Sequence, residues 1–148
     1  EIRLSLVGSE MCIRDSSLQM AVKDAGIPLE EIAYINAHAT STPVGDLNEA
    51  KAIAEVFGNH RPYVTSTKSQ TGHEMWMAGA SEVIYSILMM NNGFIAPNLN
   101  FEEPDEASAL LNIPSRRIET EFDTFLSNSF GFGGTNSSLI IRKFKENN

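Results

Sequence analysis

The chain has 148 residues, of which 42% are hydrophobic and 20% charged, and its formal net charge at pH 7 is −8. This composition is typical of a soluble globular domain, and the absence of clustered Lys and Arg argues against a nucleic-acid partner. The single cysteine, Cys12, excludes an internal disulfide framework and fits a reducing, cytoplasmic setting. No apolar run approaches the ~18 residues of a membrane helix.

Apolar and turn-forming residues predict helices at 17–25, 46–57 and 74–91, and strands at 32–36, 63–66, 125–130 and 137–143. Gly26 and Gly58 follow the first two helices, as helix-ending glycines commonly do. Asp46 followed by Glu49 resembles a capping box for the second helix. Strands that alternate with helices and then form a hairpin predict a layered α/β fold.

The predicted helix at 74–91 is apolar almost throughout, so we expect it to be buried on most faces. Lys68, His73 and Glu82 lie on or near this helix, and ionisable groups at such places need partners or a chemical role. His38 and Lys68 each follow a predicted strand. In layered α/β folds reactive groups gather beyond the carboxyl ends of strands, so we expect these two residues to meet there.

Three separated motifs carry a resemblance to a known family. They are NAHATSTPVGD at 36–46, TKSQTGH at 67–73 and NSFGFGGTN at 128–136. Together they resemble the C-terminal half of the β-ketoacyl-acyl carrier protein synthases, most closely the type I and II elongating condensing enzymes. The resemblance covers about 17–148, which we interpret as one C-terminal domain. It implies a thiolase-like α/β fold that is incomplete without an N-terminal half.

The resemblance implies an acyltransferase of fatty acid biosynthesis. Such a 3-oxoacyl-acyl carrier protein synthase joins an acyl thioester to malonyl carrier protein by decarboxylative Claisen condensation. The implied partners are acyl and malonyl carrier proteins, whose phosphopantetheine arm would pass Thr40 and Thr42, and a second identical subunit. The family needs no metal or organic cofactor, and no membrane partner is implied.

The resemblance also assigns roles to residues. His38 and His73 match the two catalytic histidines, whose N–H groups would hold the enolate formed by decarboxylation. Lys68 matches the active-site lysine, and Glu82 matches a buried glutamate that would pair with it. The expected supporting residues of the glycine-rich turn are Phe130, Gly131, Phe132 and Gly133, with Phe132 as the gating phenylalanine.

Several features depart from the family pattern. Ala39 stands where the family commonly has glycine, and Met75, Trp76 and Met77 stand where it has small residues, so acyl-chain preference is not readable. The family's nucleophilic cysteine lies in the N-terminal half, and Cys12 lacks the turn that would expose one. The stretch 1–16 resembles translated sequencing-adapter read-through, so we expect a non-native tail there and no activity from the 148-residue chain alone.

Other interpretations stay open at this stage. The chain could belong to a non-catalytic subunit like the chain-length factors, or to a polyketide ketosynthase domain. Lys68 and Glu82 could form a purely structural ion pair. A zinc site that uses His38, His60 and His73 has no supporting ligand spacing. The acidic cluster of Glu102, Glu103, Asp105 and Glu106 is interpreted as a solvated loop.

Overall fold

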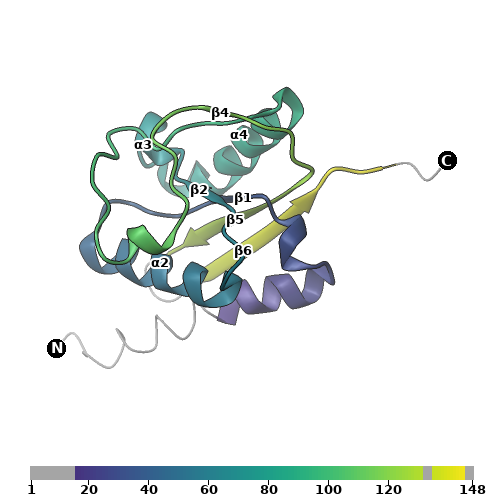
Figure 1. The fold of residues 1–148 in the computed structure, drawn as a ribbon, viewed down its shortest axis with the longest axis horizontal. Helices are drawn as coiled ribbons and strands as arrows, with labels where there is room; N and C mark the ends of the chain where they lie inside the picture. Colours follow the sequence, from purple (N-terminus) through teal and green to yellow (C-terminus); the bar gives the residue numbers. More distant parts are fainter. Residues whose placement is uncertain (1–15, 132–134, 146–148) are drawn as a thin grey trace.

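The computed structural model describes residues 16–131 and 135–145, and the fold is shown in Figure 1. A helix over 16–25 comes first. The elements that follow are η1 (Leu29–Glu31), β1 (Tyr34–Asn36), α2 (Pro43–Phe57), β2 (Tyr63–Thr65), α3 (Lys68–Thr71), η2 (Met75–Met77), α4 (Ala78–Asn92), β3 (Phe94–Ile95), η3 (Ser108–Leu110), β4 (Ile118–Glu119), β5 (Thr124–Phe130) and β6 (Asn136–Arg142). None of the helices described is long and apolar enough to cross a membrane.

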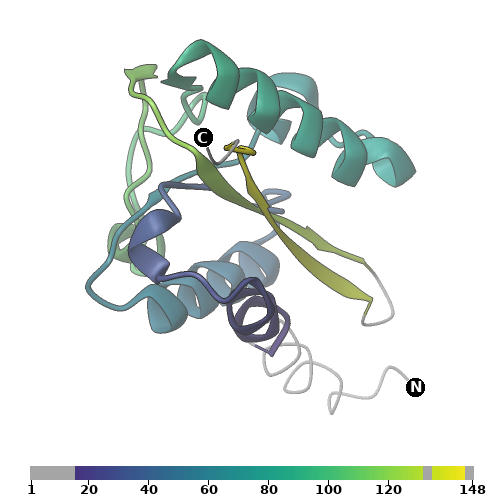
Figure 2. The same ribbon diagram turned by 90° about the vertical axis from the view of Figure 1, so that its right-hand side faces the viewer.

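The main sheet has the strand order β2-β1-β5-β6. β1 pairs in parallel with both β2 and β5, whereas β6 runs antiparallel to β5 and forms the predicted hairpin with it. Figure 2 shows α4 on one side of the sheet and α2 with the 16–25 helix on the other. The layered α/β prediction is therefore confirmed. The carboxyl ends of the three parallel strands lie at one edge of the sheet.

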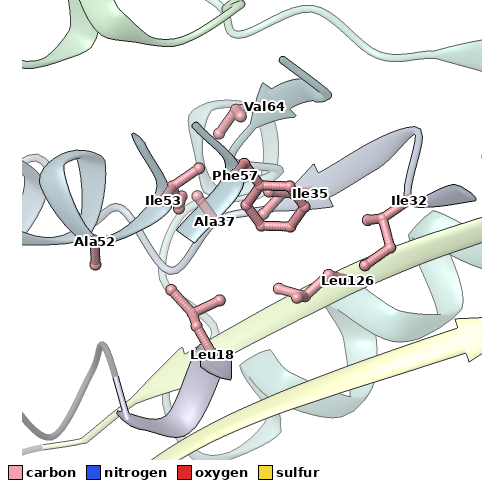
Figure 3. Packing of buried hydrophobic residues seen from close by; sticks show 9 residues of the cluster. All are labelled: Leu18, Ile32, Ile35, Ala37, Ala52, Ile53, Phe57, Val64 and Leu126. Carbon is pink, nitrogen blue, oxygen red and sulfur yellow. The ribbon is translucent and has the colours of Figure 1, made fainter. Parts of the chain in front are cut away.

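The core has two parts because successive strand residues face opposite sides of a sheet. Tyr34 and Phe125 belong to the cluster beneath α4, which includes Met89 and Met90. Their neighbours Ile35 and Leu126 belong to the other cluster. Figure 3 shows the buried members of this second cluster, which are Leu18, Ile32, Ile35, Ala37, Ala52, Ile53, Phe57, Val64 and Leu126. Each face of the sheet thus has its own hydrophobic layer.

Leu126 gives a direct test of this packing. Its side chain is 0% exposed, so Leu126→Ala should lower the free energy of unfolding by about 2–5 kcal/mol through lost burial and a residual cavity. Leu139 lies on the neighbouring strand and is 53% exposed, so Leu139→Ala is a matched control with little expected effect. Urea-induced unfolding of both variants measures the difference. Equal losses would contradict the assigned core.

Two predictions about the helices are corrected. α2 begins at Pro43 with Thr42 as its N-cap residue, so Asp46 lies within the first turn and the predicted capping box is wrong. Proline suits this first position because its fixed φ matches a helix. In the described chain α4 is not buried on most faces, since Ile84 is 56% and Leu88 52% exposed. The small β3-β4 sheet was not predicted, because two-residue strands leave no periodic signal.

Candidate active site

The structure brings His38, His73 and Phe130 together at the carboxyl edge of the sheet. His38 follows β1, and Phe130 is the last residue of β5. The ring centroids of His38 and His73 lie 5.7 Å apart at an interplanar angle of 85°. The centroids of His38 and Phe130 are 5.8 Å apart. His38 is half-buried and His73 is exposed in the described chain, so both imidazoles are within reach of a ligand at this edge.

The tautomer of His73 follows from one backbone contact. The Met75 N–H donates to Nδ1 of His73 at 3.0 Å, so this nitrogen acts as an acceptor. A neutral imidazole with an acceptor Nδ1 carries its proton on Nε2. The contact requires a sharp turn, in which Met75 adopts a φ of 53° in the left-handed region that non-glycine residues rarely occupy. The turn therefore leaves the Nε2–H of His73 free to donate to a substrate oxygen.

This arrangement predicts the tautomer of His73. In the full-length protein, nitrogen-15 NMR of labelled histidine should show the Nε2–H tautomer for the neutral imidazole of His73. A His73→Asn variant assigns the signal, and the resonance of His60 serves as an internal reference. A neutral Nδ1–H form at His73 would contradict the hydrogen bond from Met75.

Lys68 and Glu82 form a buried ion pair between the start of α3 and α4. The exposed fractions of their side chains are 6% and 3%. Burial raises the pKa of the Glu82 carboxyl, while the Lys68 ammonium opposes that rise by hydrogen bond and charge. Among the described residues Oε2 of Glu82 has no hydrogen-bond partner, so one carboxylate oxygen stays available. The pair that the motif suggested is thus present in the fold.

Asn36, the last residue of β1, contacts the elements that carry this pair, and sequence reasoning missed it. Its buried side-chain amide donates to the hydroxyl oxygens of Thr67 and Ser86 and to the carbonyl oxygen of Glu82, at distances of 3.2 to 3.3 Å. The hydroxyl of Ser86 also donates to the Glu82 carbonyl oxygen, at 2.7 Å. Asn36 therefore ties the end of β1 to α4 and to the turn that carries Lys68.

Two carboxylates hold the loop that carries His38. Glu49 accepts the N–H groups of His38 and Ala39, both at 2.8 Å. Asp46 accepts the N–H groups of Thr40 and Thr42 at 3.1 and 3.3 Å. Burial raises the pKa of both carboxyls, and these N–H groups oppose the rise. Sequence reasoning noticed Asp46 and Glu49 but assigned their hydrogen bonds to the helix rather than to the preceding loop.

A cavity of about 640 Å³ opens beside the candidate residues. Thr40, Glu49, Lys68 and His73 contribute to its wall, together with residues from the segment 98–113. The hydroxyls of Thr40 and Thr42 are 3.3 Å apart at the loop surface. The structure therefore provides a hollow next to His73 that is large enough to admit a small ligand.

The glycine-rich turn is only partly described. Gly131 donates its N–H to the carbonyl oxygen of Thr135 at 2.8 Å, which closes the base of the hairpin. Phe132 and Gly133, which the sequence suggested as supporting residues, lie outside the described residues, as does Cys12. Phe130 thus lies beside His38, and the supporting role of Gly131 and the gating role of Phe132 stay predictions.

The remaining candidates are His60 and the acidic cluster, of which Glu103 and Asp105 line the cavity. A ring nitrogen of His60 contacts the carbonyl oxygen of Ile32 at 2.9 Å. The side chains of Glu102, Glu103, Asp105 and Glu106 lie in an exposed loop, where Ser108 hydrogen-bonds Asp105 and lowers its carboxyl pKa. Within 16–131 and 135–145, no group of three His, Cys, Asp or Glu residues could hold a metal ion.

Comparisons with known proteins point to one family. The sequence matches the β-ketoacyl synthase C-terminal domain over residues 9–102, a match that begins inside the suspected tail. It is 50% identical over 129 residues to 3-oxoacyl-[acyl-carrier-protein] synthase 1 of Escherichia coli K12, and this covers 87% of the chain but 31% of the relative. The chain thus spans about a third of that relative's length.

Solved structures agree. A β-ketoacyl synthase from Burkholderia phymatum superposes with a TM-score of 0.83 at 40% identity, and the match covers 89% of this chain and 32% of that one. The second solved structure is a complex from a type II polyketide synthase. It contains an acyl-carrier protein and its ketosynthase, bound to the hexaketide. It matches with a TM-score of 0.83 at 33% identity and covers 89% of this chain and 33% of that one.

Proposed function

Because this chain belongs to the β-ketoacyl synthase family, we propose that its full-length protein is a 3-oxoacyl-acyl carrier protein synthase of fatty acid biosynthesis. The observation that carries the proposal is the edge-to-face pair of His38 and His73 at the carboxyl ends of the parallel strands. Two imidazoles at this distance can both direct N–H groups toward one oxygen atom between them. The chain supplies this half of the site, and the upstream part of the protein supplies the nucleophilic cysteine.

The chemistry assigned to the histidines is stabilisation of an enolate. When malonyl carrier protein decarboxylates, the bond to the carboxylate carbon breaks and its electron pair moves onto the thioester carbonyl, so its oxygen becomes negative. The Nε2–H of His73, left free by the Met75 contact, and an N–H of His38 donate to that oxygen. The enolate carbon then attacks the acyl-cysteine thioester, and the cysteine thiolate leaves.

Lys68 has a different role. Its ammonium pairs with Glu82, and Lys68 lines the same cavity as His73, so it places a positive charge at the wall of the site. That charge lowers the free energy of the negatively charged enolate. In the proposed mechanism Phe132, with Phe130, Gly131 and Gly133, closes over the acyl chain and contributes a backbone N–H to the oxyanion of the acyl-transfer step.

The substrates and partners follow from the same family. The acyl and malonyl groups arrive on carrier proteins, and the phosphopantetheine arm passes Thr40 and Thr42 at the loop surface. The polyketide ketosynthase that resembles this chain binds an acyl-carrier protein, which supports this assignment. We place the enzyme in the cytoplasm as a homodimer, with residues 1–16 as a non-native tail. The 50% identity to a 3-oxoacyl-[acyl-carrier-protein] synthase favours fatty acid over polyketide substrates.

The proposal is tested by restoring the upstream sequence and supplying acyl and malonyl carrier proteins. Mass spectrometry of the carrier should detect a 3-oxoacyl thioester two carbons longer than the acyl donor. The 148-residue chain alone is the matched control and should form none, because it lacks the family's nucleophile. A full-length protein that binds both carriers and forms no extended product would support a non-catalytic subunit instead.

A further inference from the structure

Glu49 is a buried carboxylate that the proposed chemistry does not use. It lies on α2, and only 3% of its surface is exposed. Burial of an ionised carboxylate is costly unless hydrogen bonds compensate for the lost water. Glu49 accepts from the consecutive N–H groups of His38 and Ala39, one on each carboxylate oxygen. The backbone at His38 is therefore attached to α2 through both oxygens of one side chain.

A chain of hydrogen bonds ends on the same carboxylate. The Ser17 hydroxyl donates to the Ser138 hydroxyl at 3.1 Å, and the Ser138 hydroxyl donates to Oδ1 of Asn128 at 2.9 Å. Because Oδ1 of Asn128 is the acceptor, the NH₂ group faces the other way and donates to Oε1 of Glu49 at 3.0 Å. The donors of Ser17, Ser138 and Asn128 all point along this chain toward Glu49. An ionised carboxylate can accept hydrogen bonds from several donors because both of its oxygens are acceptors.

We propose that Glu49 is a positioning residue that acts through the peptide groups of His38 and Ala39, and that Asn128 fixes the orientation of its carboxylate. The proposal rests on the assigned role of the His38–His73 pair. If the N–H groups of residues 38 and 39 lost their acceptor, the loop could rotate and the His38 ring would leave its place opposite His73. A displacement of ~1 Å at a catalytic group can cost about 10²-fold in rate.

Glu49→Gln is a sharp probe because it keeps the size of the side chain. Glutamine has one acceptor oxygen, so its NH₂ group must face an N–H of His38, Ala39 or Asn128. The loop then loses at least one hydrogen bond while the packing of α2 is retained. Glu55→Gln makes the same chemical change on the exposed face of the same helix and serves as the control.

The experiment separates two partial reactions of the full-length protein. Acyl transfer onto the nucleophilic cysteine does not use the histidine pair in the proposed mechanism, whereas CO₂ release from malonyl carrier protein does. For Glu49→Gln we expect CO₂ release to fall at least about tenfold and acyl transfer to stay within about twofold. Hydrogen exchange should also speed up in the peptide that covers 37–42. Glu55→Gln should change neither reaction.

The link to Asn128 is tested by a double variant. Asn128→Asp alone places two carboxylates face to face and should also slow CO₂ release. In Glu49→Gln with Asn128→Asp, the glutamine NH₂ can donate to the new carboxylate, so the combined loss should be smaller than the product of the single losses. If Glu49→Gln fails to fold, Asn128→Ala carries the same expectation of slowed CO₂ release with normal acyl transfer.

Equal loss of both partial reactions, or unchanged exchange at 37–42, would overturn the positioning role. If the rate losses of the two single variants simply multiply in the double variant, Asn128 does not orient the Glu49 carboxylate. An inactive wild-type protein is a separate result, because it would overturn the proposed synthase activity. In that case hydrogen exchange would still report whether Glu49 holds the loop.

Discussion

Replacement of His73 by alanine should lower the condensation rate of the full-length protein about 10²–10³-fold, because it deletes one of two donors to the enolate oxygen. The loss should fall on kcat, since the donor acts on charge that develops only in the transition state. The steady-state rate of 3-oxoacyl carrier protein formation measures this change in kcat. The free Nε2–H of His73, set by the contact from Met75, is the structural basis of this expectation.

His60→Ala is the matched control for this variant. His60 follows α2, and its ring contacts the carbonyl oxygen of Ile32 rather than the histidine pair. Its replacement should leave kcat within about twofold once any loss of folded protein is corrected, since it contributes nothing to the transition state. If His60→Ala and His73→Ala reduce kcat equally, the special role assigned to His73 is wrong.

The second large effect concerns the buried pair of Lys68 and Glu82. Lys68→Ala leaves the Glu82 carboxylate buried without its cation, which should lower the free energy of unfolding by about 3–5 kcal/mol. Urea-induced unfolding of the full-length protein measures this change. Lys68→Met combined with Glu82→Leu removes both charges at similar volume and should recover most of the loss.

The loss in Lys68→Ala should depend on pH. Burial already raises the pKa of Glu82 in the folded protein, and removal of the ammonium removes an opposing effect. A group whose pKa is raised by folding favours the folded state at low pH, and that contribution disappears as pH rises through the folded pKa. The deficit relative to wild type should therefore be smaller at pH 5 than at pH 8. A deficit that grows on acidification would contradict the assigned environment of Glu82.

The exposed pair of Arg117 and Glu119 provides the comparison. Their side chains are 54% and 70% exposed, so solvent and salt screen their attraction. Arg117→Ala should have little measurable effect on unfolding. A loss as large as that of Lys68→Ala would mean that burial is not what makes the Lys68–Glu82 pair important.

The sequence predicted the layered fold and the positions of His38 and Lys68 after β1 and β2, because both depend on local patterns. Short apolar segments predicted β1, β2 and β5, and residues that follow parallel strands share one sheet edge. His38 and Lys68 were placed on this basis. The family motif added His73 and Glu82, whose positions depend on the turn and helix after β2 rather than on any periodicity.

The supporting hydrogen bonds could not be predicted in the same way. Glu49 and Asn128 are 79 positions apart in the chain, and their contact exists only because β5 lies against β1 beside α2. The Asp46–Glu49 spacing suggested a helix cap, yet both carboxylates accept N–H groups from the preceding loop. Local spacing identified the right residues, and tertiary packing decided what they bind.

The exposed face of α4 shows a second limit of prediction from sequence. An almost continuous apolar pattern predicted burial, but within the described residues the buried side of the helix carries Glu82 and Ser86 while Ile84 and Leu88 face outward. Apolar periodicity does not reveal which face meets the sheet when buried polar groups have hydrogen-bond partners there. Asn36 supplies a partner for the Ser86 hydroxyl, and Lys68 supplies one for the Glu82 carboxylate.

The central claim is that His38 and His73 act together on the decarboxylation step. CO₂ release from malonyl carrier protein, measured with full-length wild-type protein, His38→Ala and His73→Ala, tests it most directly. The proposed mechanism predicts that both variants lose this step by about 10²-fold or more while they still accept an acyl group on the nucleophilic cysteine. Wild-type rates of CO₂ release in either variant would contradict a shared role of the two histidines.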